Sequence, residues 1–226
     1  MKEIIRLSVH DLVDFLLRTG DIDSRIFNLD TMAKGTIIHR FYQQKQNENY
    51  IAEYPFNETI EYKDYTFILS GRADGLIIND RSVTIEEVKS TNDDLVNFHD
   101  INQAWHLGQA QCYAYMYARK FSLNEIDCLL TYISQIDNSK DQHRYTYMME
   151  ELEQFFFQLL EQYIEFHEHI RTQRIERANT VRSLTFPFNH VRKGQQDMMK
   201  VTEDVVRRGG KVYIEAPTGI GKTMSV

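Results

Sequence analysis

Cysteine and proline are both scarce in this chain of 226 residues, which has two of the first and three of the second. Cys112 and Cys128 are too few for a disulfide scaffold, or for a four-cysteine iron–sulfur cluster within this stretch. We expect two buried thiols in a reducing, cytoplasmic setting. No apolar run approaches the ~20 residues that a membrane helix requires. The start, MKEIIRLSVHDLVDF, lacks the order of regions that marks a secretory signal.

A basic excess, the usual footprint of nucleic-acid binding, is also missing, because the formal net charge is −7. One stretch differs. Residues 170–193 hold a single acid, Glu176, among Arg171, Arg174, Arg177, Arg182, Arg192 and Lys193. Such a stretch is consistent with a basic surface that binds a phosphate backbone, or with a solvated helix end and linker. Charge alone favours the second interpretation.

The hydrophobic share of 42% is typical of a globular protein. Helical spacing appears over residues 9–19 after the candidate N-cap Ser8, and again over 30–46, 101–121 and 150–177. Period-two runs indicate strands, with tight turns between the first five: YIAEYPF, ETIEYKD, YTFILSG, ADGLIIN, SVTIEEVKS, EIDCLLTYIS and HRYTYMM. This order predicts an α+β domain with a mixed central sheet flanked by helices.

The hairpin at residues 70–90 carries the first chemical signal, Asp74 on one strand and Glu87-Val88-Lys89 on the next. Glu87 and Lys89 are two residues apart and therefore share a strand face, whereas the alternative acid Glu86 points the other way. Carboxylates suit Mg²⁺ or Mn²⁺, and a lysine beside the ion can hold water or stabilise charge. Alone the pattern is weak, because acids and lysines alternate on many solvated strands.

Three further residues flank the hairpin. His39 lies in GTIIHRF, four residues after Gly35, and Gln109 and Tyr113 share a face of the next helix. Each alone is more often an ordinary helix residue, and Gln111 with Tyr115 repeats the second spacing. His106 is more typical of a structural residue than of a DNA contact, and Glu53 is a weaker candidate for an outer carboxylate.

Together the ordered set G-x3-H, G-x2-D, E-x-K and Q-x3-Y, over residues 24–120, resembles the RecB-like branch of the PD-(D/E)XK nucleases. The resemblance implies a restriction-endonuclease-like fold and a metal held by His39, Asp74, Glu87 and the Val88 carbonyl. It implies that Asp74, Glu87 and Lys89 are catalytic and that Gln109 and Tyr113 organise the site and the DNA. Ala73 replaces the family's usual proline, and the four-cysteine cluster of some relatives is missing.

A second pattern begins after a boundary at residues 183–196. A helix is expected over 195–208, a strand over 211–215, and then Ala216–Thr223, which fits a P-loop with alanine for its first glycine. Together with FPFNHVRKGQQDMM, it resembles the start of a superfamily-two DNA helicase of the DinG and XPD kind. The resemblance implies ATP with Mg²⁺, bound by Arg192 and Gln195 (or Gln196) at the adenine and by Thr218, Gly219, Gly221, Lys222 and Thr223 at the phosphates.

The sequence therefore predicts a nuclease domain over residues 1–180, followed over 181–226 by the start of a RecA-like α/β ATPase domain. The expected function is metal-dependent hydrolysis of single-stranded DNA within a longer helicase, for DNA repair or a related pathway. Arg171, Arg174, Arg177 and Tyr113 are the expected DNA contacts, and no membrane is expected. Without a water-positioning acid, this stretch alone should not hydrolyse ATP. Two alternatives stay open: an inactive nuclease fold that docks DNA, and an ATPase whose first domain contacts protein.

Overall fold

The computed structural model describes residues 2–18, 29–183, 185 and 189–217. The chain divides into two compact units, Met1–Ile170 and Arg171–Val226, and each is described by itself. The assignment of residues 1–180 and 181–226 to a nuclease and an ATPase domain stays a prediction. No helix among the described residues is long and apolar enough to cross a membrane.

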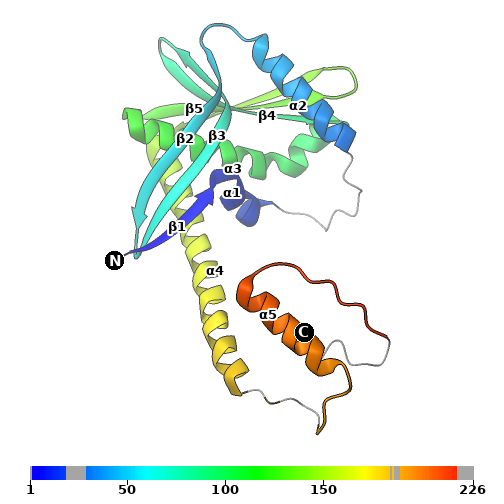
Figure 1. The fold of residues 1–226 in the computed structure, drawn as a ribbon. Coiled ribbons are helices and arrows are strands. Elements are labelled where there is room, and N and C mark those ends of the chain that lie inside the picture. The colour runs from blue at the N-terminus through cyan, green and yellow to red at the C-terminus, as the bar shows by residue number, and fades with distance from the viewer. Residues whose placement is uncertain (1, 19–28, 184, 186–188, 218–226) are drawn as a thin grey trace. The chain divides into compact units, whose positions relative to one another are not determined.

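The first unit holds one sheet and its helices (Figure 1). In chain order its elements are β1 (Glu3–Ser8), α1 (Val9–Leu17), α2 (Leu29–Gln44), β2 (Tyr50–Tyr62), β3 (Tyr65–Asn79), β4 (Ser82–Thr91), α3 (Leu95–Phe121), β5 (Glu125–Ser134), β6 (Lys140–Met148) and the first part of α4 (Met149–Ser183). The predicted helices are all present within a few residues of their expected bounds, although α3 begins earlier. Its N-cap is Asp94, whose side chain accepts a hydrogen bond from the Asn97 amide.

The six strands form a mixed sheet of order β1-β3-β4-β5-β6, with β2 also paired to β3. The β1–β3 and β4–β5 pairs are parallel and the other pairs are antiparallel. This confirms the predicted mixed sheet between helices. The expected hairpin at residues 70–90 is the β3–β4 pair. β1 was not predicted, because six residues before a helix give too short a pattern.

Four of the predicted short strands are in fact two long ones, which corrects the expected run of tight turns. YIAEYPF and ETIEYKD join in β2, and YTFILSG and ADGLIIN join in β3. Pro55 does not break β2, because β2 pairs only with β3 and its other edge needs no amide donor. Gly71 and Gly75 likewise lie inside β3 rather than in turns.

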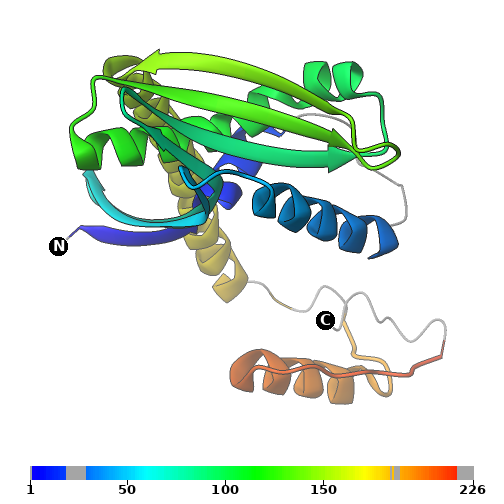
Figure 2. The same cartoon turned by 90° about the horizontal axis from the view of Figure 1, so that it is seen from above.

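Each face of the sheet has its own buried cluster. The large cluster joins the sheet to α1, α3 and α4 and includes Leu12, Leu69, Ala110 and Phe156. A small one, made of Ile38, Tyr42, Val88 and Ile133, holds α2 against β4 and β5. Figure 2 shows α2 and α3 on opposite faces of the sheet. Residues of β4 that alternate along the strand therefore face different helices.

The second unit contains α5 (Gln195–Arg208), which confirms the predicted helix. The strand predicted over residues 211–215 is wrong, because residues 211–217 form neither helix nor strand. A strand requires a hydrogen-bonded neighbour, and no described residue of this unit forms one. The P-loop residues Thr218, Gly219, Gly221, Lys222 and Thr223 lie outside the described residues.

Candidate active site

The candidate site lies where β3 and β4 part. These strands are paired from Asn79–Ser82 to Gly75–Glu86. Beyond that pair, β3 runs along β1 while β4 continues along β5. Asp74 and Glu87 are the next residues on each strand. The topology thus places both predicted carboxylates at a fork in the sheet, where backbone groups are not used by the β3–β4 ladder.

Asp74 is held at this fork by three hydrogen bonds from three elements. Its carboxylate oxygen Oδ2 accepts from the Val88 backbone N–H of β4 at 2.7 Å. Its carbonyl oxygen accepts from the Gln43 amide of α2 at 3.0 Å and from the Tyr50 hydroxyl of β2 at 3.3 Å. The hydrogen bond to Val88 bridges the fork and fixes Asp74 beside the E-x-K segment.

Glu87 and Lys89 form an ion pair on the α3 side of β4. Burial raises the pKa of Glu87 to about 7, although the positive charge of Lys89 acts against the increase. Burial also opposes the charged form of Lys89, but the carboxylates of Glu87 and Asp74 outweigh it and hold the lysine pKa above its usual value. Glu87 is therefore buried and Lys89 half-buried, and each stabilises the charged form of the other.

His39 comes from α2, on the opposite side of the sheet from α3. Burial lowers the pKa of its imidazole, and the Lys89 charge lowers it further, while Asp74, Glu53 and a hydrogen bond to the Val88 backbone act the other way. A neutral imidazole is the form that ligates metals. His39 thus interacts with Asp74, Lys89 and the Val88 backbone, while its role as a metal ligand stays a prediction.

The donor set fits a hard divalent ion: two carboxylates, an imidazole and a strand backbone. Among the described residues, however, no three His, Cys, Asp or Glu side chains already form a cluster that could hold a metal. The Glu87 carboxylate is paired with Lys89 and that of Asp74 with the Val88 amide. Ion binding would therefore exchange these internal partners for the metal.

Gln109 and Tyr113 support the site from α3, and both are buried. The Gln109 amide nitrogen lies 3.0 Å from His10 Nδ1 of α1. The Tyr113 ring covers Gly71, and its hydroxyl is hydrogen-bonded to the Arg72 backbone, two residues before Asp74. The Tyr113 side chain thus connects the Q-x3-Y helix to the G-x2-D strand, whereas the Gln109 side chain contacts α1.

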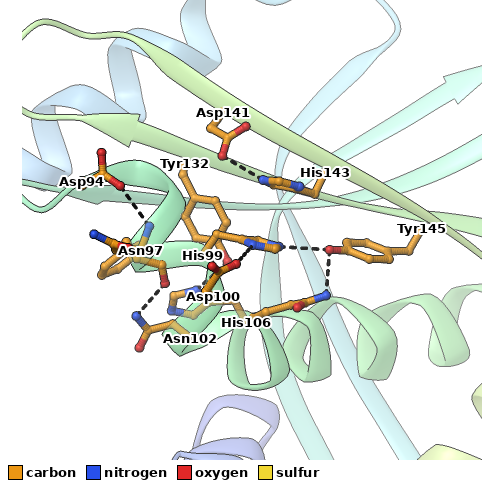
Figure 3. A network of polar contacts seen from close by, with 12 residues as sticks. Asp94, Asn97, His99, Asp100, Asn102, His106, Tyr132, Asp141, His143 and Tyr145 are labelled. Carbon is orange, nitrogen blue, oxygen red and sulfur yellow. Dashed lines mark hydrogen bonds and ion pairs between the residues drawn. The ribbon is translucent and has the colours of Figure 1, made fainter.

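Figure 3 shows the polar network that joins the first half of α3 to β5 and β6. His106 Nδ1 lies 3.1 Å from the Tyr132 hydroxyl, and Tyr132 is the β5 partner of Lys89. Further along, the His99 and His143 rings stack with centroids 3.8 Å apart. His106 is 1% exposed, which confirms its structural role.

Glu86, also fully buried, faces α2 and accepts from the Tyr42 hydroxyl at 2.7 Å.

Glu53 has an unusual backbone at the edge of the site. Its φ is 54°, and it lies between the paired residues Ala52 and Tyr54, opposite Asp74 in the β2–β3 register. The Gln43 amide that binds the Asp74 carbonyl also lies 3.2 Å from the Glu53 carboxylate. Left-handed backbone at a non-glycine residue inside a strand is strained, and such strain gathers at functional sites.

Sequence reasoning missed the contribution of α1. His10 and Asp14 are one turn apart, and Asp14 Oδ1 accepts from the Trp105 indole N–H at 2.5 Å. The Asp14 charge also acts on Lys89. No motif marks these residues. Only the packing of α1 onto α3, where Gly108 meets Leu17 and Val13, brings them here.

The other predicted contacts lie in the second unit. Arg171, Arg174 and Arg177 are exposed on α4, and Arg192 is exposed before α5. Gln195 is buried, and its side-chain oxygen accepts from the Arg192 backbone N–H at 2.7 Å, so it holds the turn that precedes its own helix. Gln196 is exposed.

Comparison with known proteins agrees with this architecture. The family model of the PD-(D/E)XK nuclease superfamily matches residues 20–193, and the chain belongs to that superfamily. A solved structure titled "Crystal structure of SSO0001" is similar at a TM-score of 0.50 and 20% identity, over 74% of this chain and 78% of that chain. At this identity the likeness shows the fold alone. None of the curated proteins matches this chain.

Proposed function

We propose that this chain is a divalent-metal-dependent nuclease that hydrolyses phosphodiester bonds in single-stranded DNA. Membership of the PD-(D/E)XK superfamily supports it. The observation that carries it is the fork itself, where the Val88 amide binds the Asp74 carboxylate beside the pair of buried Glu87 and half-buried Lys89. Nuclease chemistry needs carboxylates and a cation at one place, and this fork supplies them.

In this proposal His39, Asp74, Glu87 and the Val88 carbonyl hold Mg²⁺ or Mn²⁺, which polarises the scissile phosphate when bound. With Glu87 as a metal ligand, the Lys89 ammonium group would be available to orient water or to stabilise the charge that develops on the phosphate. Gln109 and Tyr113 act as positioning residues, through His10 and through the Gly71–Arg72 backbone respectively. Each role uses a group whose place in the fold is described above.

We also propose that the nuclease precedes a helicase motor of the DinG and XPD kind, and that the motor exposes the single strand. The support is the sequence resemblance from about residue 184 onward, together with the presence of α5. Arg192, Gln195 and the P-loop would bind ATP in that motor. The exposed arginines Arg171, Arg174 and Arg177 of α4 would guide the strand.

The test is cleavage of end-labelled single-stranded DNA by the 226-residue chain in Mg²⁺, Mn²⁺ or EDTA. Wild type should cut in either metal and not in EDTA, and Asp74→Asn and Lys89→Met should each reduce cutting by at least a hundredfold. Asp80→Asn is the matched control, because Asp80 lies in the exposed turn of the same hairpin. It should cut like wild type.

Two results would overturn the proposal. Cutting that persists equally in Asp74→Asn and Lys89→Met would show a contaminating activity. A wild-type chain that binds DNA but never cuts, in either metal, would instead support a nuclease fold kept for docking DNA.

A further inference from the structure

A polar surface beside the fork, formed by α1 and α3, supplies none of the proposed metal ligands. On α1, His10, Asp14 and Arg18 follow one another at four-residue spacing, with Arg18 as the C-cap. On α3, Trp105 and Gln109 are one turn apart. Residues at this spacing share a helix face, so two polar rows meet along the α1–α3 contact.

The rows are linked to one another by specific contacts. Gln109 lies 3.0 Å from His10 Nδ1, and the Trp105 indole N–H donates to Asp14 at 2.5 Å. The Arg18 guanidinium carbon lies 4.9 Å from the centre of the Trp105 ring. The Arg18 Nη1 atom lies 3.8 Å from Asp14 Oδ2. The surface is therefore organised before any ligand arrives.

Burial divides these residues into a base and an outer layer. Gln109 is 3% exposed and the Asp14 side chain 23%. Above them, the His10 and Arg18 side chains are 61% and 57% exposed. Gln109 and Asp14 thus support an imidazole and a guanidinium that are exposed to solvent. A planar guanidinium can bind two oxygens of a phosphate at once.

This surface adjoins the catalytic lysine. Burial opposes the charge of Lys89, and the carboxylates that raise its pKa include Asp14 as well as Glu87 and Asp74. Gly108, one residue before Gln109, presses α3 against Leu17 and Val13 of α1, so the two helices cannot separate locally without losing core contacts. Trp105 also packs on His106 with ring centroids 4.8 Å apart, and His106 contacts Tyr132, the β5 partner of Lys89. A strand bound at Lys89 would therefore bring its neighbouring phosphates towards this surface.

We propose that Arg18, stacked on Trp105, is a binding subsite for a backbone phosphate of the nucleic-acid strand, next to the phosphate that is cut. The inference rests on the proposed nuclease function and identifies residues with which that site would bind its substrate. His10, held by Gln109, lines the same subsite. Asp14 is the positioning residue that orients Trp105.

The test is equilibrium binding of a fluorescent oligothymidylate to the 226-residue chain in EDTA, so that cleavage plays no part. Arg18→Gln should weaken binding about tenfold and reduce the slope of log affinity against log salt by about 0.7, the value for one contact with single-stranded DNA. Arg18→Lys should keep the salt slope, because the positive charge remains, and lose part of the affinity, because lysine lacks the planar guanidinium group. Trp105→Phe should weaken binding about threefold.

Arg81→Gln is the matched control, since Arg81 is an exposed arginine in the β3–β4 turn, and it should bind like wild type. In Mg²⁺, Arg18→Gln should raise KM while kcat stays within about twofold, as for a contact made equally in ground and transition states. Unchanged affinity and salt slope in both Arg18→Gln and Trp105→Phe would overturn the subsite. If the Arg18 effects appear in a chain that never cuts, the subsite stands and the nuclease function fails.

Discussion

The Tyr113 ring rests directly on the backbone of Gly71, so that a Cβ at Gly71 would stand 2.4 Å from the tyrosine hydroxyl oxygen. Gly71 precedes Asp74 by three residues, and Tyr113 follows Gln109 by four. This contact is the physical reason why the two motifs occur together. The tyrosine can lie on β3 only where the strand has no side chain, and it then fixes the strand that carries the carboxylate.

Gly71→Ala should therefore cost about 1–3 kcal/mol of unfolding free energy, the usual range for an overpacked core. Tyr113 must move, and Asp74 with it, so DNA cleavage should fall as well. The measurement is urea unfolding followed by circular dichroism, alongside the cleavage assay. Gly35→Ala is the control, because its Cβ would meet the ends of two flexible side chains, Ser90 Oγ at 3.1 Å and Gln135 Nε2 at 3.6 Å, and alanine favours the helix. An equal loss in both variants would contradict the role of Tyr113.

Acid should destabilise the first unit through His106. Burial, followed by the charges of Lys89 and His99, lowers the pKa of His106 to about 3 in the folded chain. In the unfolded chain it returns to about 6.5. Between these values the unfolded state binds the extra proton, so the unfolding free energy falls by up to about 1.4 kcal/mol for each pH unit below 6.5.

His106→Gln should remove this dependence, which urea unfolding at a series of pH values would measure. Tyr132→Phe is the control, because it deletes the hydrogen-bond partner of His106 but keeps the histidine. It should lower stability at every pH and retain the slope. A variant without His106 that still shows the wild-type slope would assign the acid sensitivity to other groups.

Divalent ions should stabilise the folded chain. At a Mn²⁺ concentration a hundred times the dissociation constant, the gain is about 2.7 kcal/mol for one site, and EDTA should reverse it. Thermal unfolding of wild type, Asp74→Asn and Glu87→Gln would measure the effect, which we expect to be absent in both variants. Asp93→Asn, on the loop before α3, provides the control for general ionic effects. Equal stabilisation of all four proteins would show that the ion binds elsewhere.

Replacing Glu53 should make the metal-free chain more stable. Left-handed backbone costs a residue with a Cβ about 1–2 kcal/mol, and asparagine tolerates it better. Glu53→Asn should thus raise the unfolding free energy by about 0.5–1 kcal/mol. Glu58→Asn, in the same strand but without positive φ, is the comparison and should give no gain. If both changes lower stability alike, the backbone at Glu53 is not the source of strain.

The sequence predicted most of the fold because its strong local signals agree with the tertiary structure. Ser8 does cap α1, with its side chain accepting from the Asp11 amide, and the spacing of Leu152, Phe156, Leu159 and Leu160 does mark the buried face of α4. The order of helices and strands was sufficient for a mixed sheet. Nothing local shows that Pro55 and Gly71 lie inside long strands, because that depends on the neighbouring strands.

The residues of the candidate site likewise fall into those that the sequence could predict and those that it could not. Residues in a motif, such as Asp74 and Lys89, could be found from the pattern, because the chemistry limits which side chains serve. His10, Asp14 and Trp105 could not, because their proximity arises from the packing of α1 on α3. The predicted strand at residues 211–215 failed for a related reason: an apolar run becomes a strand only beside a partner.

The small buried cluster beneath α2 affects how the site opens. In the described part of α2, its buried apolar contacts with the sheet are confined to the small cluster of Ile38, Tyr42, Val88 and Ile133, whereas α3 belongs to the large cluster on the other face. The free energy of local unfolding should therefore be lower for α2 than for α3, and its amide protons should exchange with solvent sooner. Since α2 carries His39 and Gln43, the imidazole and the amide bonded to Asp74 can leave the fork together while Asp74, Glu87 and Lys89 remain folded. We therefore expect a ligand to enter and leave the fork through a partial, reversible opening of the domain.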